Sequence, residues 1–158
     1  MAKVLIVGGA GYIGSINTRY FLDRGYEVVV VDSLNTGHRS SVDPRAKFYQ
    51  LDIRKKDELA EILKKEKVDA VVHFAALSLV GVSMQDPLAY FDNNVYGMIA
   101  LLEAMQEAKV NKIVFSSSAA TYGEQDRSPL TEDTPTNPSS VYGETKLMME
   151  TMMRWCDR

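Results

Sequence analysis

Short apolar runs alternate with longer amphipathic stretches along this chain of 158 residues. The runs are nearly continuous in Val, Ile and Phe, which is typical of strands buried on both faces of a parallel sheet. They cover residues 4–7, 28–31, 47–51, 70–74 and 112–115, of which the third is the weakest. This order of elements predicts an α/β protein in which five strands are covered by helices.

Helical periodicity fills the intervals between the apolar runs. Residues 12–24 place Ile13, Ile16 and Tyr20 on one face, which we expect to pack on the sheet. The stretch 86–108 opens with an aspartate and a proline, a strong start signal for a helix. Joined by right-handed crossovers, these elements predict an open, doubly wound (Rossmann) sheet with the strand order 3-2-1-4-5.

Composition and charge fit one globular domain over residues 1–158. Hydrophobic residues make up 46 % of the chain, and 18 basic against 21 acidic side chains leave a net charge of −3. That balance gives no electrostatic reason to expect binding to nucleic acid or to a membrane. A single cysteine, Cys156, forms no internal disulfide, and we find neither a signal peptide nor an apolar span of about 20 residues. We therefore expect a cytoplasmic protein.

A glycine-rich turn joins the first strand to the first helix. Its sequence is Gly8-Gly9-Ala10-Gly11-Tyr12-Ile13-Gly14, a G-x-x-G-x-x-G motif. Glycine lets the backbone approach a pyrophosphate closely, and the helix that follows directs free N–H groups and its positive dipole end at the phosphate. A tight turn without a ligand is the alternative, but the position between a strand and a helix favours dinucleotide binding.

Asp32 ends the second strand, eighteen residues after Gly14. A carboxylate at this place accepts hydrogen bonds from an adenine ribose and repels a 2′-phosphate, which favours NAD over NADP. The alternative is an aspartate that caps the turn after the strand.

Tyr142 and Lys146 are four positions apart, so they lie on one face of the last expected helix. An ammonium beside a phenol favours the phenolate, and such a tyrosine can act as a general base. A pair without function, exposed on a helix, is the alternative. The serines at 116–118 follow the fifth strand at the sheet edge where ligands bind. One hydroxyl there can bind a substrate oxygen, although for Ser116 and Ser117 we prefer a turn-forming role.

The two histidines give no sign of a metal site. Neither His38 nor His73 has neighbours at the spacing of metal ligands, so we expect no metal. His73 lies in an apolar run, which is typical of a core histidine.

Several stretches together carry a resemblance to a known family. They are GGAGYIGS at 8–15, HFAA at 73–76, DNNV at 92–95, FSSSA at 115–119, YG at 122–123 and YGETKL at 142–147. The chain resembles the extended short-chain dehydrogenase/reductase family and, within it, the N-terminal half of the UDP-glucose 4-epimerases. The resemblance implies that NAD stays bound and emerges unchanged. The cofactor site that it implies consists of Gly8, Gly11, Tyr12, Ile13, Gly14, Asp32, Asn35, Asp52, Ile53, Phe74, Ala75, Ala76, Asn93, Tyr142 and Lys146.

The resemblance also implies an isomerase of galactose metabolism that interconverts UDP-glucose and UDP-galactose. Tyr142, as the phenolate, would take the proton of the sugar 4-hydroxyl while hydride passes from C4 to NAD⁺. The 4-keto sugar turns over, and hydride returns to its other face. Lys146 would hold the nicotinamide ribose and keep Tyr142 acidic, and Ser118 matches the catalytic serine or threonine of the family.

The family carries a substrate domain after the Tyr/Lys helix, and this chain stops inside that helix. We therefore expect the NAD-binding portion of an epimerase, without efficient turnover by the chain itself. Two alternatives stay open: an isolated NAD-binding module, or another NAD-dependent sugar-nucleotide enzyme such as a 4,6-dehydratase. Against the dehydratase, two alanines follow Ser118 where that enzyme has an acidic pair.

The last helix has two apolar ridges, and one sheet can cover only one of them. The ridges are Met148, Met152 and Trp155, and Met149, Met153 and Cys156. The family dimerises by packing this helix with the 86–108 helix, so we expect a homodimer or a larger association.

Overall fold

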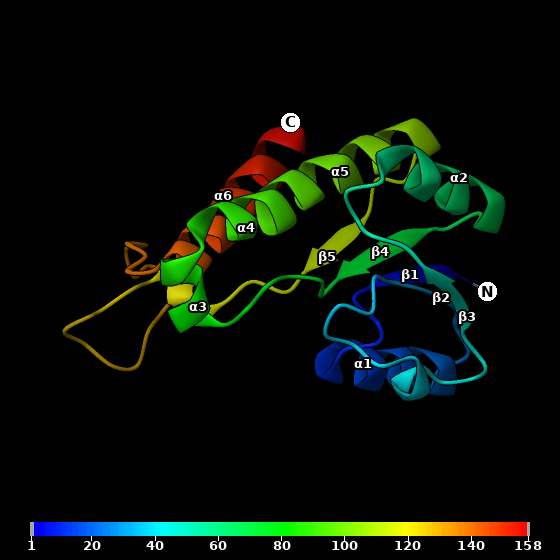
Figure 1. Cartoon of the computed structure of the whole chain (residues 1–158), viewed down its shortest axis with the longest axis horizontal. Helices are drawn as coiled ribbons and strands as arrows, with labels where there is room; N and C mark the ends of the chain where they lie inside the picture. The colour runs from blue at the N-terminus through cyan, green and yellow to red at the C-terminus, as the bar shows by residue number, and fades with distance from the viewer. Residues whose placement is uncertain (1, 158) are drawn as a thin grey trace. The chain divides into compact units, whose positions relative to one another are not determined.

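The computed structural model describes residues 2–157 (Figure 1). The chain divides into two compact units. The first, which we call the sheet unit, combines the residues up to Ala75 with Met98–Ser116. The second, the helical unit, combines Ala76–Gly97 with the residues from Ser117 on. The expectation of one domain over residues 1–158 stays a prediction.

Five parallel strands form the sheet unit, in the predicted order β3-β2-β1-β4-β5. They are β1 (Lys3–Val7), β2 (Glu27–Asp32), β3 (Lys47–Gln50), β4 (Ala70–His73) and β5 (Ile113–Phe115). Val7 of β1 is in register with Val31 of β2 and with His73 of β4. The carboxyl ends of these strands therefore meet at one edge of the sheet, where the glycine turn and the other predicted cofactor residues of this unit follow them.

Helices cover both faces of this sheet (Figure 1). They are α1 (Tyr12–Asp23) on one face, and α2 (Lys56–Glu66) and α5 (Gly97–Ala108) on the other. On the α1 side, Ile6 and Val30 are buried in a cluster against which Phe21 packs. On the other side, Lys64 of α2 donates to Glu107 of α5 at 2.7 Å. The predicted doubly wound sheet, covered by helices, is thus confirmed.

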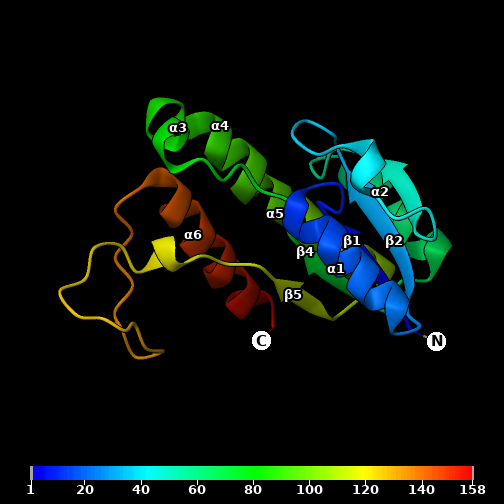
Figure 2. The same cartoon turned by 90° about the horizontal axis from the view of Figure 1, so that it is seen from below.

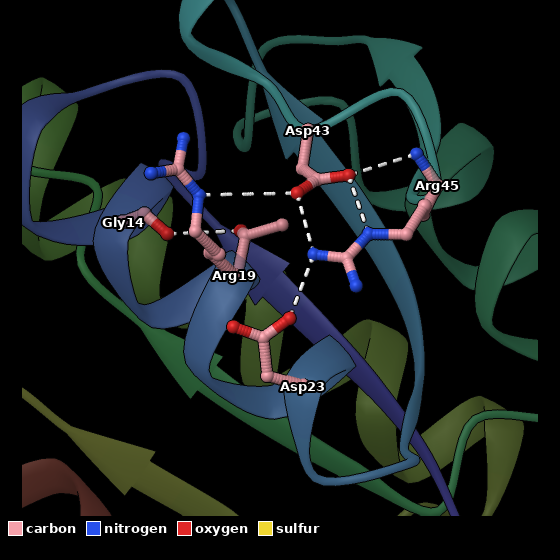
Figure 3. Close-up of polar contacts among 6 residues, drawn as sticks. Gly14, Arg19, Asp23, Asp43 and Arg45 are labelled. Atoms are coloured by element: carbon pink, nitrogen blue, oxygen red, sulfur yellow. Dashed lines mark hydrogen bonds and ion pairs between the residues drawn. The ribbon is translucent and has the colours of Figure 1, made fainter.

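The face of α1 that packs on the sheet is not the predicted one. Ile13, Ile16 and Tyr20 are exposed, the last two at 53 % and 50 %, whereas Gly14 and Thr18 are buried. The Thr18 hydroxyl donates to the Gly14 carbonyl at 2.9 Å (Figure 3). Gly14 is on the buried face because the helix starts so close to the end of β1 that a larger side chain does not fit there, and Phe21, further along the helix, packs against the sheet cluster.

An ion-pair network fastens the loop between β2 and β3 to α1 (Figure 3). The Arg45 guanidinium donates two hydrogen bonds to Asp43, and its Nη2 lies 2.9 Å from an oxygen of Asp23 in α1. Arg19 Nε lies 3.9 Å from Asp43 Oδ2. The hydrogen bonds from Arg45 lower the pKa of Asp43 to about 2, so this carboxylate stays ionised at neutral pH.

The helical unit consists mainly of short helical segments and one longer helix. Its elements are α3 (Val80–Gln85), α4 (Pro87–Tyr90), the π-helical η2 (Phe91–Tyr96), the 3-10 turn η3 (Ala119–Thr121) and α6 (Val141–Cys156). The helix predicted over 86–108 begins as expected, because the Asp86 carboxylate accepts from the Ala89 N–H at 3.3 Å. Its middle is π-helical instead of α-helical, a local widening that is frequent at functional sites.

Candidate functional site

The glycine turn bends sharply between β1 and α1. Gly8 has a φ of +82°, which glycine adopts without strain. A Cβ at this residue would lie 2.6 Å from the backbone nitrogen of Ala75, and a Cβ at Gly14 would lie 2.1 Å from the Gly8 carbonyl oxygen. At Gly11 the corresponding distance, to the same oxygen, is an ordinary 3.5 Å. The first and third glycines of the motif are therefore required by backbone packing alone.

The start of α1 has the geometry of an anion site. Gly11 is the N-cap, with an extended backbone and no side chain bonded to the first turn. The first N–H groups of a helix have no acceptor within it, and they carry the positive end of its dipole. Tyr12 and Ile13, the first two helical residues, are exposed. A phosphate binds to helices in this way.

Asp32 bonds to the backbone through both of its carboxylate oxygens. Oδ2 accepts from the Ala10 N–H at 2.9 Å, and Oδ1 accepts from the Leu34 N–H at 2.8 Å. The structure thus confirms the turn-capping interpretation. Each oxygen has a second lone pair that can accept a further donor, so ribose binding by the same carboxylate stays a prediction.

Other predicted cofactor residues follow the ends of β2 and β3. Asn35 is exposed on the loop after β2, and Ile53 is buried after β3. Asp52 accepts hydrogen bonds from Nε and Nη2 of Arg54 at 3.0 and 2.5 Å. These bonds lower the pKa of the Asp52 carboxyl, which is therefore ionised and already paired with a cation.

The residues after β4 continue the same edge of the sheet. Phe74 and Ala75 donate their N–H groups to the Val7 carbonyl at 2.8 and 3.1 Å. Ala76 and Asn93, which the resemblance also assigns to the cofactor, belong to the helical unit. The predicted cofactor residues are thus distributed over both units.

Tyr142 and Lys146 lie in the first two turns of α6, as predicted. The helix begins after Ser140, whose Oγ accepts from the Gly143 N–H at 3.1 Å. Lys146 Nζ lies 5.8 Å from the centre of the Tyr142 ring, within the range of a cation–π contact. The structure therefore brings the predicted acid–base pair together.

Lys146 is buried, with 3 % of its surface exposed. Burial disfavours the ammonium form and lowers the pKa of Lys146 from 10.5 to about 8. The side chain is therefore still largely protonated at neutral pH, and it loses its proton under mildly alkaline conditions.

Ser118 begins the turn η3, which packs against α6 (Figure 2). Its Oγ accepts from the Ala120 N–H at 3.1 Å. A Cβ at Gly143 would lie 2.4 Å from the Ala120 carbonyl oxygen, so the glycine beside Tyr142 permits this close packing. The helical unit thus places the turn of Ser118 against the helix that carries Tyr142 and Lys146.

Two buried residues that the sequence did not single out hold the start of α6. Ser83 of α3 accepts from the Tyr142 N–H through its Oγ at 3.1 Å. Asn94 of η2 donates from Nδ2 to the Thr145 hydroxyl at 3.1 Å. The partners are 59 and 51 positions apart in the chain, so no local pattern could reveal these bonds.

Ser117 also bonds to α6, through its hydroxyl donating to the Glu150 carboxylate. The turn-forming role that the sequence favoured for Ser117 therefore did not include this contact with α6. This bond lies between the residue before Ser118 and the residue one turn after Lys146, and it fastens the end of the serine segment to α6.

Residues 2–157 contain neither a cluster of metal ligands nor a membrane-spanning helix. Within that range no three His, Cys, Asp or Glu side chains are grouped so that they could hold a metal ion. In the same part of the chain no helix is long and apolar enough to cross a membrane.

Comparison with protein families assigns these features to one group. The model of the NAD dependent epimerase/dehydratase family matches residues 4–158. The chain belongs to this family. The match includes the glycine turn, Asp32 and the α6 residues Tyr142 and Lys146, and it confirms the resemblance found in the sequence.

Individual family members are closely similar to the chain. The UDP-glucose 4-epimerase of Lactobacillus helveticus is 58 % identical over 156 residues, which cover 99 % of this chain and 47 % of the relative. The UDP-glucose 4-epimerase of Streptococcus mutans is 56 % identical over 98 % of this chain and 47 % of its own length. The chain therefore spans about half the length of the curated relatives it matches.

Solved structures of family members agree with the fold. The UDP-glucose 4-epimerase from Brucella ovis in complex with NAD is 43 % identical, with a TM-score of 0.95 over 98 % of this chain and 47 % of that chain. The enzyme from Bifidobacterium longum in complex with NAD⁺ and UDP is 36 % identical, with a TM-score of 0.92 over 97 % of this chain and 48 % of that chain.

Because Lys146 is buried and its pKa is lowered, we expect the stability of the protein to depend on pH. Below pH 8 the folded and the unfolded state both hold the proton, and the folded state bears the full cost of a buried ammonium. As the pH rises from about 8 to 10.5, the folded state loses its proton first, so the free energy of unfolding increases, by up to about 3 kcal/mol.

Urea unfolding at a series of pH values measures this increase, and Lys146→Met should remove it. Lys112→Met, which changes an exposed lysine, serves as the matched control and should retain the increase. An increase of the same size in Lys146→Met would contradict the assignment to Lys146.

Proposed function

We propose that this chain is the NAD-binding portion of an enzyme that interconverts UDP-glucose and UDP-galactose. The observation that carries the proposal is the glycine turn, in which residues 8 and 14 admit no side chain and the first turn of α1 is presented to an anion. Asp32 follows on the neighbouring strand, where a carboxylate favours NAD over NADP. The NAD complex of the similar Brucella ovis epimerase supports the proposal.

The proposed cofactor residues come from both units. In the sheet unit they are Gly8, Gly11, Tyr12, Ile13, Gly14, Asp32, Asn35, Asp52, Ile53, Phe74 and Ala75, and in the helical unit Ala76, Asn93, Tyr142 and Lys146. When bound, NAD would supply the hydride acceptor for oxidation of the sugar carbon and, once reduced, the hydride donor for its reduction, so the reaction causes no net oxidation. The protein binds the diphosphate through backbone N–H groups and the adenine ribose through Asp32.

The helical unit supplies the acid–base groups in this proposal. Tyr142 takes the proton of the sugar 4-hydroxyl and later returns it. Lys146, still largely protonated at neutral pH, binds the nicotinamide ribose and stabilises negative charge on Tyr142. Ser118 hydrogen-bonds the same sugar oxygen. The NAD⁺ and UDP complex of the Bifidobacterium longum epimerase supports a nucleotide sugar as the substrate.

An NAD-binding module without turnover is the second candidate. It requires only the anion site at the start of α1 and Asp32, both in the sheet unit, and in this case the chain binds NAD without efficient turnover. A 4,6-dehydratase is disfavoured, because Ala119 and Ala120 follow Ser118 where that enzyme has an acidic pair.

We further propose a cytoplasmic homodimer. One ridge of α6 is packed within the helical unit at Met149, whereas Met148 and Trp155 of the other ridge are exposed, the latter at 66 %. A second copy of the chain would cover this apolar surface. Light scattering of the purified chain should give twice the mass of 17.6 kDa or more, and a single monomeric species would contradict the proposal.

Cofactor binding can be measured directly on this chain. The purified protein should carry NAD, seen by absorbance after denaturation, or should bind added NAD more tightly than NADP in calorimetric titration. Gly14→Ala should weaken NAD binding by at least about tenfold, since the new Cβ would lie 2.1 Å from the Gly8 carbonyl oxygen. Gly81→Ala is the matched control, because a Cβ there meets nothing within 4 Å. A wild-type chain that neither carries nor binds NAD refutes the proposed function.

Turnover separates the two candidate functions. If the chain converts UDP-galactose to UDP-glucose even slowly, Tyr142→Phe should lower the rate by at least about a hundredfold, because a positioned acid–base group contributes that much. The variant should still bind NAD. A rate that Tyr142→Phe leaves unchanged contradicts the role of Tyr142, whereas NAD binding with no product at all supports the module without turnover.

A further inference from the structure

The turns after β1 and β2 are joined through the backbone of one residue, Ala10. Its N–H donates to Asp32 Oδ2 at 2.9 Å, and its carbonyl accepts from the His38 N–H at 3.1 Å. Ala10 is buried. Both backbone polar groups of Ala10 are therefore bonded to the end of β2 or to the loop after it, and the glycine turn is held from outside its own segment.

The same carboxylate holds the second turn. Asp32 Oδ1 accepts from the N–H of Leu34, which has a φ of +62°. This left-handed conformation is unfavourable for a residue with a branched side chain, so it persists only where the surroundings stabilise it. Asp32 thus bridges two backbone segments, each through its own oxygen.

The loop after β2 also packs closely against the glycine turn. A Cβ at Gly37 would lie 2.9 Å from the Ala10 Cβ, so the loop after β2 lies directly against the glycine turn. At its far end the same loop is fastened to α1 through Asp43, Arg45 and Asp23 (Figure 3). The loop can therefore act as a fixed support for the turn.

We infer that Asp32 is a positioning residue for the glycine turn, in addition to any contact with ribose. Its carboxylate fixes the peptide between Gly9 and Ala10, and through it the direction of the N–H groups at the start of α1, before a ligand binds. Groups that are ordered in advance lose less entropy on binding, which increases affinity for the diphosphate. This inference rests on the proposed NAD binding.

Asp32 should therefore affect the choice between NAD and NADP in two opposing ways. Removing the Asp32 charge relieves the repulsion of a 2′-phosphate, which alone would favour NADP. The same change also releases Ala10 and Leu34, so the diphosphate loses its ordered turn. We therefore expect that Asp32→Ala lowers the affinity for NAD without raising that for NADP above the wild-type affinity for NAD.

Two ligands separate the roles of Asp32: ADP and 2′,3′-dideoxy-ADP, which lacks the ribose hydroxyls. Their affinities for the wild-type chain and for Asp32→Ala are measured by calorimetric titration. The variant should bind dideoxy-ADP at least about tenfold more weakly than the wild type does, the effect of one hydrogen bond to a charged group. Loss of charge repulsion would act in the opposite direction, so it cannot produce this result.

Equal or tighter binding of dideoxy-ADP by Asp32→Ala overturns the inference and leaves Asp32 as a ribose contact only. NADP binding by this variant as tight as NAD binding by the wild type overturns it as well. The matched control is Asp69→Ala, which also removes a carboxylate bonded to a backbone N–H, that of Lys3 at 2.7 Å, at the opposite end of the sheet. This control should bind both nucleotides as the wild type does.

Hydrogen exchange of the ligand-free chain tests the inference independently of binding. Asp32→Ala should accelerate exchange at the Ala10 and Leu34 amides, and Asp32→Asn, with one accepting oxygen, at only one of them. Unchanged exchange in both variants overturns the inference. If the wild-type chain binds no nucleotide, the proposed function fails, but the exchange result still decides whether Asp32 orders the turn.

Discussion

The sheet unit depends on one close approach of two backbone segments, between Gly14 and the carbonyl of Gly8. A Cβ at residue 14 would lie 2.1 Å from that oxygen, so only glycine allows α1 to start directly at the end of β1. The approach decides which face of α1 is buried, and it leaves the first N–H groups of the helix at the sheet edge. Fold and anion site thus have the same physical cause.

The strands and their order could be predicted from the sequence, whereas the buried face of α1 could not. The strands were predictable because runs such as 28–31 are apolar on both faces, and the doubly wound arrangement expected of a dinucleotide-binding sheet gave their order, which the structure shows. The buried face of α1 was predicted wrongly, because the hydrophobic pattern favoured Ile16 and Tyr20. The close approach instead puts Gly14 on the buried face, together with Thr18 one turn further on. Their spacing of four was visible in the sequence but carried no hydrophobic signal.

The candidate site was predictable to the extent that its residues belong to local motifs. Tyr142 and Lys146 are one helical turn apart, and the cap at Ser140 determines where that helix begins. The bonds that hold the same helix in place could not be predicted, because Ser83 and Asn94 are distant in sequence from their partners. Such bonds arise only when the folded chain brings distant segments together. For the same reason, the bridge made by Asp32 could be stated only as an alternative.

The burial of Lys146 indicates that function, and not stability alone, determines which residue stands at this position of the helical unit. An ammonium that is 3 % exposed destabilises the folded state, and stability alone would place an apolar residue there. The bonds of Ser83 and Asn94 to the same helix stabilise the position of the lysine against this cost. A charge that is held in a costly place by bonds from other elements is typical of a functional group. The packing of α6 therefore supports the chemical role of Lys146 independently of the sequence motif.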